Sequence, residues 1–299
     1  MIQLNNFANN ENLKQIAQMG SYTVYEHQKD MSVAPSYASV AYFMHEMNVR
    51  KRQVLCCLNG TSVRVQAGAM QWTAGSVESE TGVKGVGDFL GKALKGAVTN
   101  ESAVKPVYNG WGYLMLEPTY NYIILEDVAT WGSGIVLDDG MFLACDAGLN
   151  ETVVARNSVS SALLGGEGLF NLSLSGQGIA VLESPVPREE LFEIVLDNDV
   201  VKIDGNLAIA WSGSLDFTVE RAGKSLHGHL HFSLLSKSLQ RVCLAQLLTV
   251  KVLLMYIVVR DASSWHLQST EPQCQHLILL SRIPEYHQRV SYQALPRVH

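Results

Sequence analysis

The sequence predicts an all-β protein built from repeats, and two observations support this class. Three segments resemble one another: those beginning at Gly68, Gly140 and Asn206 read GAMQWTAGSV, GMFLACDAGL and NLAIAWSGSL, at steps of 72 and 66 residues. A second pair keeps the step of 66, because NGWGYLMLE at 109–117 recurs as SGQGIAVLE at 175–183. Self-similarity at a fixed period indicates a repeat architecture in which each copy is one small structural unit.

Composition and charge restrict the class of protein further. The chain has 299 residues, of which 47% are hydrophobic and 17% charged, as in a globular protein. Its net charge of −6 is uneven: from Gly228 onward there are 7 Lys and Arg against 3 Asp and Glu, so the preceding body carries −10. A body of that charge repels phosphate backbones, which makes nucleic acid an unlikely partner.

The cysteines and the N-terminus predict where the protein resides. The five cysteines are an odd number with no C-x-x-C spacing, and the adjacent Cys56 and Cys57 point to opposite faces of a strand. Free thiols in a reducing compartment follow from this usage. Residues 1–20 carry only Glu11 and Lys14 as charges and lack the features of a signal or transit peptide. We expect a cytoplasmic protein of bacterial origin.

The first hundred residues mix strand signals with two irregular stretches. A short helix is expected over Asn10–Met19, and the pattern from Gly20 onward is strand-like, with alternation over 21–25 and 61–65. The basic run NVRKR at 48–52 is interpreted as a solvated face or strand edge, with an anion site as the alternative.

A glycine-rich stretch at residues 82–97 contains a G-x-G followed by Gly91-Lys92. Neither G-x-x-x-x-G-K-[ST] nor G-x-G-x-x-G is present, so the spacing of a phosphate-binding loop is not met. We interpret the stretch as a loop that leads into a short helix and connects two repeats.

Residues 106–225 contain the clearest strand signals. Short apolar runs are bounded by Gly, Asp, Asn or Pro at 120–125, 134–137, 169–174, 179–182 and 207–211. Many short strands at even spacing predict a barrel, a sandwich or a β-helix. The Gly-x-Gly pairs suit tight corners, where a side chain would obstruct the turn or a neighbouring strand.

The composition changes abruptly near residue 227. All 24 glycines lie at or before Gly228, and seven of the nine histidines lie at or after His227. A further Gly-x-Gly segment is due near 242–249 but is replaced by the apolar stretch 242–259, which contains Gln246 and Lys251. A membrane-spanning helix needs about 20 apolar residues, so we expect a buried or aggregation-prone stretch, with membrane association left open.

Candidate chemistry is sparse. His227, His229 and His231 alternate and could share one face of a strand, yet the glutamate that follows an H-x-H metal motif in cupins is missing, so no metal site is predicted. No nucleophile motif G-x-S-x-G occurs. His27 and His45 are interpreted as ordinary surface or core histidines. No catalytic, cofactor-binding or metal residue is therefore assigned, and no cofactor is expected.

Acidic pairs and tryptophans receive structural interpretations. Asp138-Asp139, Glu189-Glu190 and Asp197-x-Asp199 each lie beside a turn signal, where carboxylates bond their own backbone. Trp72 and Trp211 occupy equivalent repeat positions and are expected to be core wedges. Together with Trp111 they also motivate an alternative, a small-ligand pocket within a repeat or between subunits.

The body also resembles a known family. The residues that carry the resemblance are NVRKR at 48–52, GGEGLF at 165–170, LSGQG at 174–178 and GKSL at 223–226. Over residues 20–226 the chain is similar to the altered-inheritance-of-mitochondria 24 family. The resemblance implies a fold like the tryptophan-RNA-binding attenuation protein: short double-stranded β-helix units, here in about three pseudo-repeats. It also implies homo-oligomers, with a trimer favoured, and it supplies no catalytic residue.

The chain departs from the family after Leu226. We expect a TRAP-like β-repeat domain at 1–226 with an incomplete last repeat, and an anomalous tail at 227–299 for which an altered reading frame is our hypothesis. The predicted function is a non-enzymatic, homo-oligomeric scaffold or interaction protein. The alternatives are the small-ligand-binding module and, less favoured because of the charge of the body, RNA binding by analogy to the attenuation protein.

Overall fold

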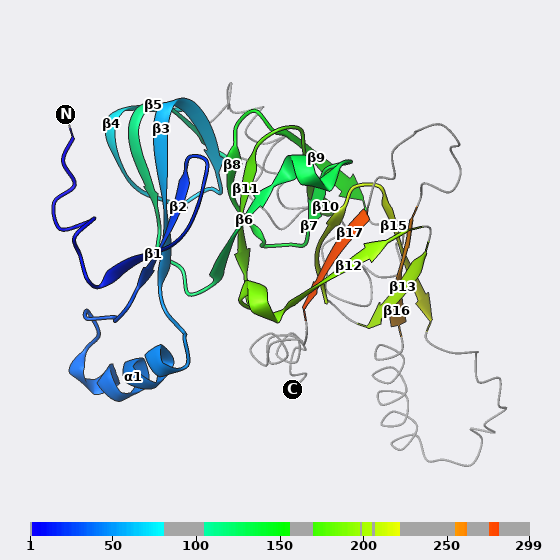
Figure 1. The fold of residues 1–299 in the computed structure, drawn as a ribbon, viewed down its shortest axis with the longest axis horizontal. Coiled ribbons are helices and arrows are strands. Elements are labelled where there is room, and N and C mark those ends of the chain that lie inside the picture. Colours follow the sequence, from blue (N-terminus) through cyan, green and yellow to red (C-terminus); the bar gives the residue numbers. More distant parts are fainter. Residues whose placement is uncertain are drawn as a thin grey trace, which may run out of the picture.

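The computed structural model describes residues 2–80, 105–155, 170–197, 199–204, 207–221, 255–261 and 275–280, and in this part the protein is mostly β (Figure 1). The described strands form antiparallel sheets of eight, six and three strands, and one α-helix accompanies them. The all-β class expected from the repeats is therefore confirmed at this level.

The elements are distributed as follows. The eight-stranded sheet contains β1 (Leu13–Met19), β2 (Tyr22–His27), β3 (Arg52–Val65), β4 (Met70–Glu80), β5 (Val107–Leu116), β6 (Tyr122–Asp127), β8 (Phe142–Asp146) and β11 (Ile179–Ser184). The six-stranded sheet contains β7 (Ile135–Leu137), β9 (Asn150–Ala155), β10 (Phe170–Ser175), β12 (Leu191–Leu196), β14 (Ala208–Ser212) and β17 (Gln275–Leu280). The three-stranded sheet contains β13 (Val200–Asp204), β15 (Leu215–Arg221) and β16 (Met255–Asp261). The helices are α1 (Ala38–Glu46) and the 3-10 turns η1 (Pro35–Tyr37), η2 (Val128–Trp131) and η3 (Arg188–Glu190).

The eight-stranded sheet curls back on itself. Its main order is β1-β2-β3-β8-β11-β6, and the end strands β1 and β6 come into contact. Alternate side chains of β2 point inward, so Tyr22 and Val24 are fully buried in the apolar interior. The Tyr22 hydroxyl donates to Asp146 Oδ1 at 2.9 Å, which ties β2 to the end of β8 across the curled sheet.

The same pairing pattern occurs three times along the chain. β3 and β4 both pair with β5; β6 and β8 both pair with β11, while β7 and β9 both pair with β10. β12 and β14 both pair with β17, while β13 and β15 both pair with β16. The three similar sequence segments are β4, β8 and β14, so similar sequence occupies similar positions in the pairing.

The register between successive sets repeats as well. β3 pairs with β8 so that Val65 lies opposite Ala144, and β7 pairs with β14 so that Leu137 lies opposite Ala210. The second pair is displaced from the first by 72 and 66 residues on its two strands, the same steps that separate the similar segments. A one-residue slip would turn every side chain of a strand to the other face, so an equal register keeps equal faces buried.

The Gly-x-Gly pairs share their backbone conformation. Gly110 and Gly112 have φ of 123° and 152°, and Gly176 and Gly178 have φ of 113° and 151°. A Cβ on Gly112 would lie 2.0 Å from the carbonyl oxygen of Ala74 in the neighbouring strand. The close approach to a neighbouring strand is confirmed, although the first pair lies inside β5 and not at a corner.

Two expectations for the N-terminal region are wrong. Asn10–Met19 is not a helix, because its second part is β1, which pairs with β2 across the turn at Gly20. A helix of that length is marginal without a packed face, whereas the hairpin provides hydrogen bonds to a neighbouring strand. Conversely, Ala38–Glu46 is helical within a region where only strands were expected, and Pro35 opens the preceding 3-10 turn.

The tail supplies strands in the structure. β16 and β17 both come from residues after 227, and they occupy in the third set the places that β10 and β11 hold in the second. Residues 255–259 of the apolar stretch lie in β16, and 242–254 lie outside the described residues. Within the described ranges, no helix has the length and apolar content needed to span a membrane. The reading-frame hypothesis stays a prediction.

The steric role of Gly112 can be tested with Gly112→Ala. We expect a loss of at least about 2 kcal/mol in the free energy of unfolding, because the new Cβ meets the Ala74 carbonyl and φ is positive. Gly148→Ala is the matched control: its Cβ has no heavy atom within 4 Å, so a change within about 0.5 kcal/mol is expected. Urea unfolding measures both, and equal losses would show that the contact with Ala74 is not the cause.

Candidate functional site

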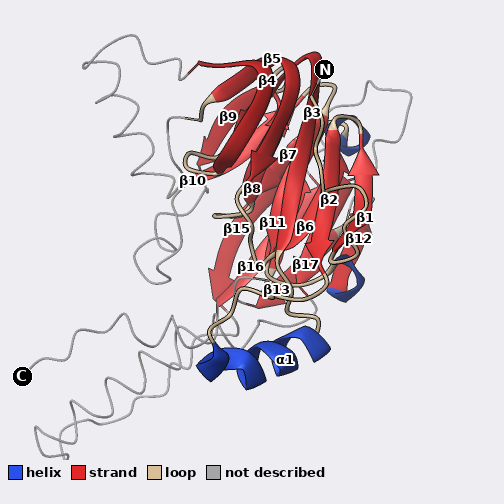
Figure 2. Ribbon diagram, turned by 90° about the vertical axis from the view of Figure 1, so that its left-hand side faces the viewer, coloured by secondary structure: helices blue, strands red, loops and turns tan. Residues whose placement is uncertain are grey.

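α1 projects from one end of the first sheet, in the connection between β2 and β3 (Figure 2). The helix ends at Asn48, whose φ of 61° is left-handed, as is common just after a helix. Two backbone bonds close this end: Asn48 N–H donates to His45 O at 3.0 Å, and Val49 N–H donates to Met44 O at 2.8 Å. The basic run that follows is thereby directed back under the helix into β3.

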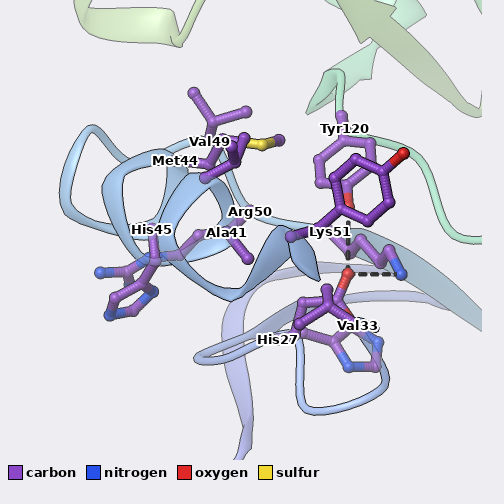
Figure 3. Close-up of a pocket in the computed structure, with 12 residues that line it drawn as sticks. His27, Val33, Ala41, Met44, His45, Val49, Arg50, Lys51 and Tyr120 are labelled. Carbon is purple, nitrogen blue, oxygen red and sulfur yellow. Dashed lines mark hydrogen bonds and ion pairs between the residues drawn. The ribbon is translucent and has the colours of Figure 1, made fainter. Parts of the chain in front are cut away.

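A pocket of about 160 Å³ lies between α1, the ends of β2 and β3, and Tyr120 (Figure 3). The helical side is mainly apolar and the strand side mainly polar. The lining residues are His27, Asp30, Val33, Tyr37, Val40, Ala41, Met44, His45, Val49, Arg50, Lys51 and Tyr120. Pockets of this kind, with an apolar wall and a few convergent polar groups, are typical ligand sites.

An ion pair closes one side of the pocket. Lys51 Nζ lies 2.7 Å from Asp30 Oδ2, and the Tyr120 hydroxyl donates to the same oxygen at 3.1 Å. The Ser32 hydroxyl donates to the other oxygen, Asp30 Oδ1, at 2.9 Å. Hydrogen bonding from Lys51, with further bonds from Ser32 and Tyr120, lowers the pKa of Asp30 to about 2. The same pairing raises the pKa of Lys51.

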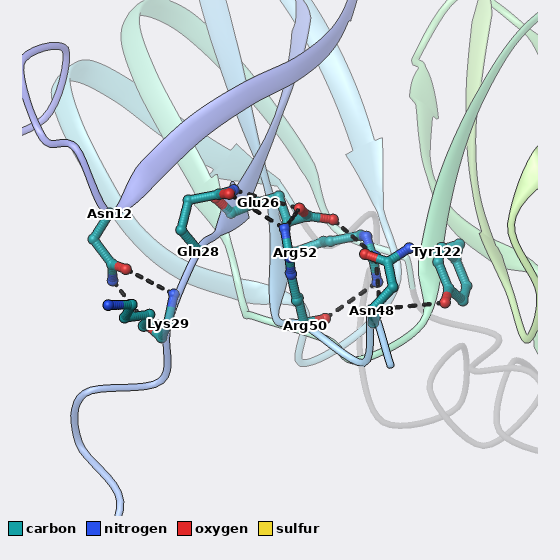
Figure 4. Close-up of polar contacts among 8 residues, drawn as sticks. All are labelled: Asn12, Glu26, Gln28, Lys29, Asn48, Arg50, Arg52 and Tyr122. Atoms are coloured by element: carbon teal, nitrogen blue, oxygen red, sulfur yellow. Dashed lines mark hydrogen bonds and ion pairs between the residues drawn. The ribbon is translucent and has the colours of Figure 1, made fainter. Parts of the chain in front are cut away.

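A buried ion pair lies behind the pocket (Figure 4). Arg52 is 2% exposed, and its Nη2 lies 2.8 Å from Glu26 Oε2. Its guanidinium group lies over the Tyr122 ring at 4.0 Å from the centroid, and it donates to the carbonyl oxygens of Arg50 and Asn48. Because the Tyr122 hydroxyl also donates to the Asn48 carbonyl, this network fixes the end of the helical segment.

Arg50 connects the buried pair to the pocket. Its Nη1 lies 3.0 Å from Glu26 Oε1 and donates to Gln28 Oε1 at 3.2 Å. Three cations, Arg50, Lys51 and Arg52, thus face two carboxylates, Glu26 and Asp30, which leaves one positive charge in excess.

Two nitrogen atoms of the pocket residues are buried without a hydrogen-bond partner: Arg50 Nε and His45 Nδ1. Buried polar groups in native proteins are nearly always bonded, so such atoms call for an explanation. The other pocket histidine differs, because His27 Nε2 lies 2.7 Å from Gln53 Oε1.

These contacts correct two interpretations of the sequence. The run at 48–52 is not a solvated face, because Arg52 is buried and each cation of the run has a carboxylate partner. The reason lies far away in sequence, since Glu26 and Asp30 come from the end of β2 and the following loop. His45 is not an ordinary satisfied histidine, because burial removes Nδ1 from water without supplying a partner.

The structure does not bring the three tryptophans together. Trp211 is 5% exposed in β14 and packs in the core, as expected. Trp72 is half-buried in β4, and Trp111 is 66% exposed in β5, with its ring lying over Gly60. The ligand pocket that they motivated is therefore not formed by these residues in a single chain.

The remaining candidates are structural or lie outside the described part. Cys56 and Cys145 are buried free thiols, and burial raises the pKa of Cys145 to about 12, which makes it a poor nucleophile. Residues 138–140, η3 and the Asp197–Asp199 bend are turns, as predicted. Residues 82–97 and 227–231 lie outside the described residues, and the described ones include no group of three potential metal ligands.

Sequence reasoning missed the pocket itself. Asp30 and Tyr120 are 90 residues apart and meet only because their strands neighbour each other through β3. One local signal was present: residues 38–44 are apolar or small and immediately precede a basic run, which is an unusual composition for a solvated connection.

The chain was compared with known proteins. The model of the family described as Mitochondrial biogenesis AIM24 matches residues 46–246, which is more than half of the chain and extends beyond Leu226. A crystal structure of protein SPYM3_0169 from Streptococcus pyogenes superimposes with a TM-score of 0.52 at 21% identity, covering 83% of this chain and 96% of that one. This likeness shows the fold alone. No curated protein matches the sequence significantly.

The buried and the outer ion pair should differ in their effect on stability. Arg52→Met leaves Glu26 buried with one cation fewer, and we expect a loss of about 3 kcal/mol in the free energy of unfolding. Lys51→Met breaks the outer pair and should cost no more than about 1 kcal/mol. Urea denaturation distinguishes the two, and equal losses would contradict the structural role of Arg52.

The Asp30 carboxyl predicts a limited acid dependence of stability. Its pKa is about 2 in the folded protein, against about 3.9 for a free aspartate, so the Lys51 pair stabilises the fold above about pH 4. That contribution is lost as the pH falls from about 4 to about 2, and it stays below about 1 kcal/mol because the pair is partly exposed. The difference in urea midpoint between wild type and Asp30→Asn should therefore shrink on acidification; a constant difference would exclude the assignment.

Proposed function

Because the chain belongs to the Mitochondrial biogenesis AIM24 family, we propose that it is a non-enzymatic, homo-oligomeric scaffold that acts by binding protein surfaces. The observation that carries this proposal is the outer face of α1. Tyr42, Phe43 and Met47, on the side of the helical segment away from the pocket, are 60%, 66% and 75% exposed. None of the helix residues is buried.

An apolar helix without a buried face is unusual in a protein that acts alone. Helices that are hydrophobic on all sides are normally covered, and large exposed apolar patches mark interaction sites. The rings of Tyr42 and Phe43 lie edge to face at 5.5 Å, so the two present one aromatic surface. Aromatic residues and methionine are enriched in the cores of protein interfaces.

A second copy of the chain is the partner that this face supports best. α1 contains no Lys or Arg, and Glu46 is its only acidic residue, so two copies can meet without strong charge repulsion. The same neutral charge argues against an anionic lipid surface, which attracts helices with basic polar faces. Closed symmetric assemblies use such self-complementary patches, and the trimer implied by the family resemblance is one of them.

The repeated pairing and register support a finer description of the fold. We propose that the chain is built from three TRAP-like units of short double-stranded β-helix, one for each recurrence of the pairing pattern, with β16 and β17 belonging to the third. The cytoplasmic location remains part of the proposal.

The pocket favours a second candidate function, a small-ligand-binding module. Its specific support is the pair of unbonded buried nitrogen atoms at Arg50 and His45. RNA binding by analogy to the attenuation protein has no comparable support, because each cation of the basic run is paired with a carboxylate.

Self-association through α1 predicts that Phe43→Glu converts the oligomer to a monomer. A buried unpaired carboxylate in the interface is strongly unfavourable, whereas the exposed monomer tolerates it. Phe192→Glu is the matched control, because Phe192 is 59% exposed on β12, and it should leave the oligomer intact. Sedimentation equilibrium measures both masses. A monomeric wild type would refute the proposal, and dissociation by Phe192→Glu alone would place the interface elsewhere.

A further inference from the structure

We infer that the pocket between α1 and the ends of β2 and β3 binds a small monoanion with a compact apolar body, such as a short-chain or aromatic carboxylate. The inference deepens the small-ligand candidate above and is independent of self-association through the outer face of α1. Three properties of the pocket carry it: its size, the division of its wall into apolar and polar sides, and its unsatisfied positive charge (Figure 3).

The size sets the scale of the ligand. The pocket measures about 160 Å³, and an apolar cavity of about 150 Å³ is known to hold benzene. A single ring or a short alkyl chain with one polar group therefore fits. Tyr37 and Val40 line the pocket yet are 65% and 54% exposed, so it is open to solvent and a ligand can enter without unfolding the helix.

The wall has two chemically distinct sides. Val40, Ala41 and Met44 from α1, with Val33 and Val49 from its flanks, make an apolar surface. Arg50, Lys51 and Asp30 make the opposite side, from the end of β2 and the start of β3. A ligand with an apolar body and a charged end would be oriented by this division, whereas a purely polar ion such as phosphate would leave the apolar side in water.

The charge of the site selects an anion. Lys51 is closed by Asp30, and Arg52 is buried against Glu26. Arg50 shares that glutamate, so the excess positive charge is on the arginine that lines the pocket. A single excess charge matches a monoanion and would be overcompensated by a dianion.

The unbonded nitrogens identify the donors. Arg50 Nε is always protonated and has no acceptor in the described part of the chain. His45 Nδ1 is the second unbonded nitrogen and donates in the tautomer that carries its proton there. A carboxylate could accept from both with its two oxygens, and satisfying a buried donor removes a cost of about 1–3 kcal/mol.

The experiment compares benzoate with benzamide, which has the same ring and no charge, using calorimetric titration of the full chain. Benzoate should bind at least about tenfold more tightly, because a hydrogen bond to a charged group contributes about 1.5–3 kcal/mol. Arg50→Lys retains the charge but removes Nε, and His45→Phe retains a ring but removes both nitrogens. Each should weaken benzoate about tenfold and leave benzamide unchanged. Arg64→Lys, at the other end of β3, is the matched control and should change neither affinity.

Ala41→Phe tests the location independently of charge. The larger side chain fills the apolar side of the pocket, so it should abolish the binding of both compounds while the circular dichroism of the β fold is retained. Phe43→Glu should bind benzoate as the wild type does, so failure of self-association leaves this result interpretable. No benzoate binding by wild type, equal affinity for benzoate and benzamide, or undiminished binding by Ala41→Phe would each overturn the inference.

Discussion

Backbone pairing between successive copies of one strand pattern is the interaction on which the rest of the structure depends. A set of short strands that ends in free edges exposes unbonded N–H and C=O groups, and each set here solves this by pairing with the next. β3 joins β8 as β7 joins β14, in the same register. The glycine pairs in β5 and before β11 serve the same constraint, because a side chain at Gly112 would occupy the space of the neighbouring strand.

This rigid arrangement determines where a site can form. Since β2 and β3 are paired along their length, the two chain segments that leave their ends are held side by side. Residues 28–51 join them without contributing to any sheet, so this connection can carry a helix and charged residues without disturbing the fold. Glu26 and Arg52, at the base of the connection, lie opposite each other in the β2–β3 register.

The buried ion pair gives the connection its shape. Arg52 bonds the carbonyl oxygens of Arg50 and Asn48, so a side chain at the start of β3 holds the backbone that follows α1. The helix thereby keeps one side over the pocket and turns the other, with Tyr42 and Phe43, to solvent. Ligand binding on one side and self-association on the other would be linked through this short helix, because both depend on the same placement of its axis.

The sequence by itself determined the all-β class, the period of the repeats and most of the strands, because alternation, turn residues and recurring glycines are local signals. It also identified Trp211 as a core residue. It assigned a helix to Asn10–Met19 and overlooked the one at Ala38–Glu46, because hairpin pairing and capping by distant groups decide such short elements. Only the tertiary structure decided that the basic run is buried and paired and that Asp30 meets Tyr120. Charge pairing and burial depend on contacts between residues far apart in the chain, and neither composition nor spacing encodes those distances.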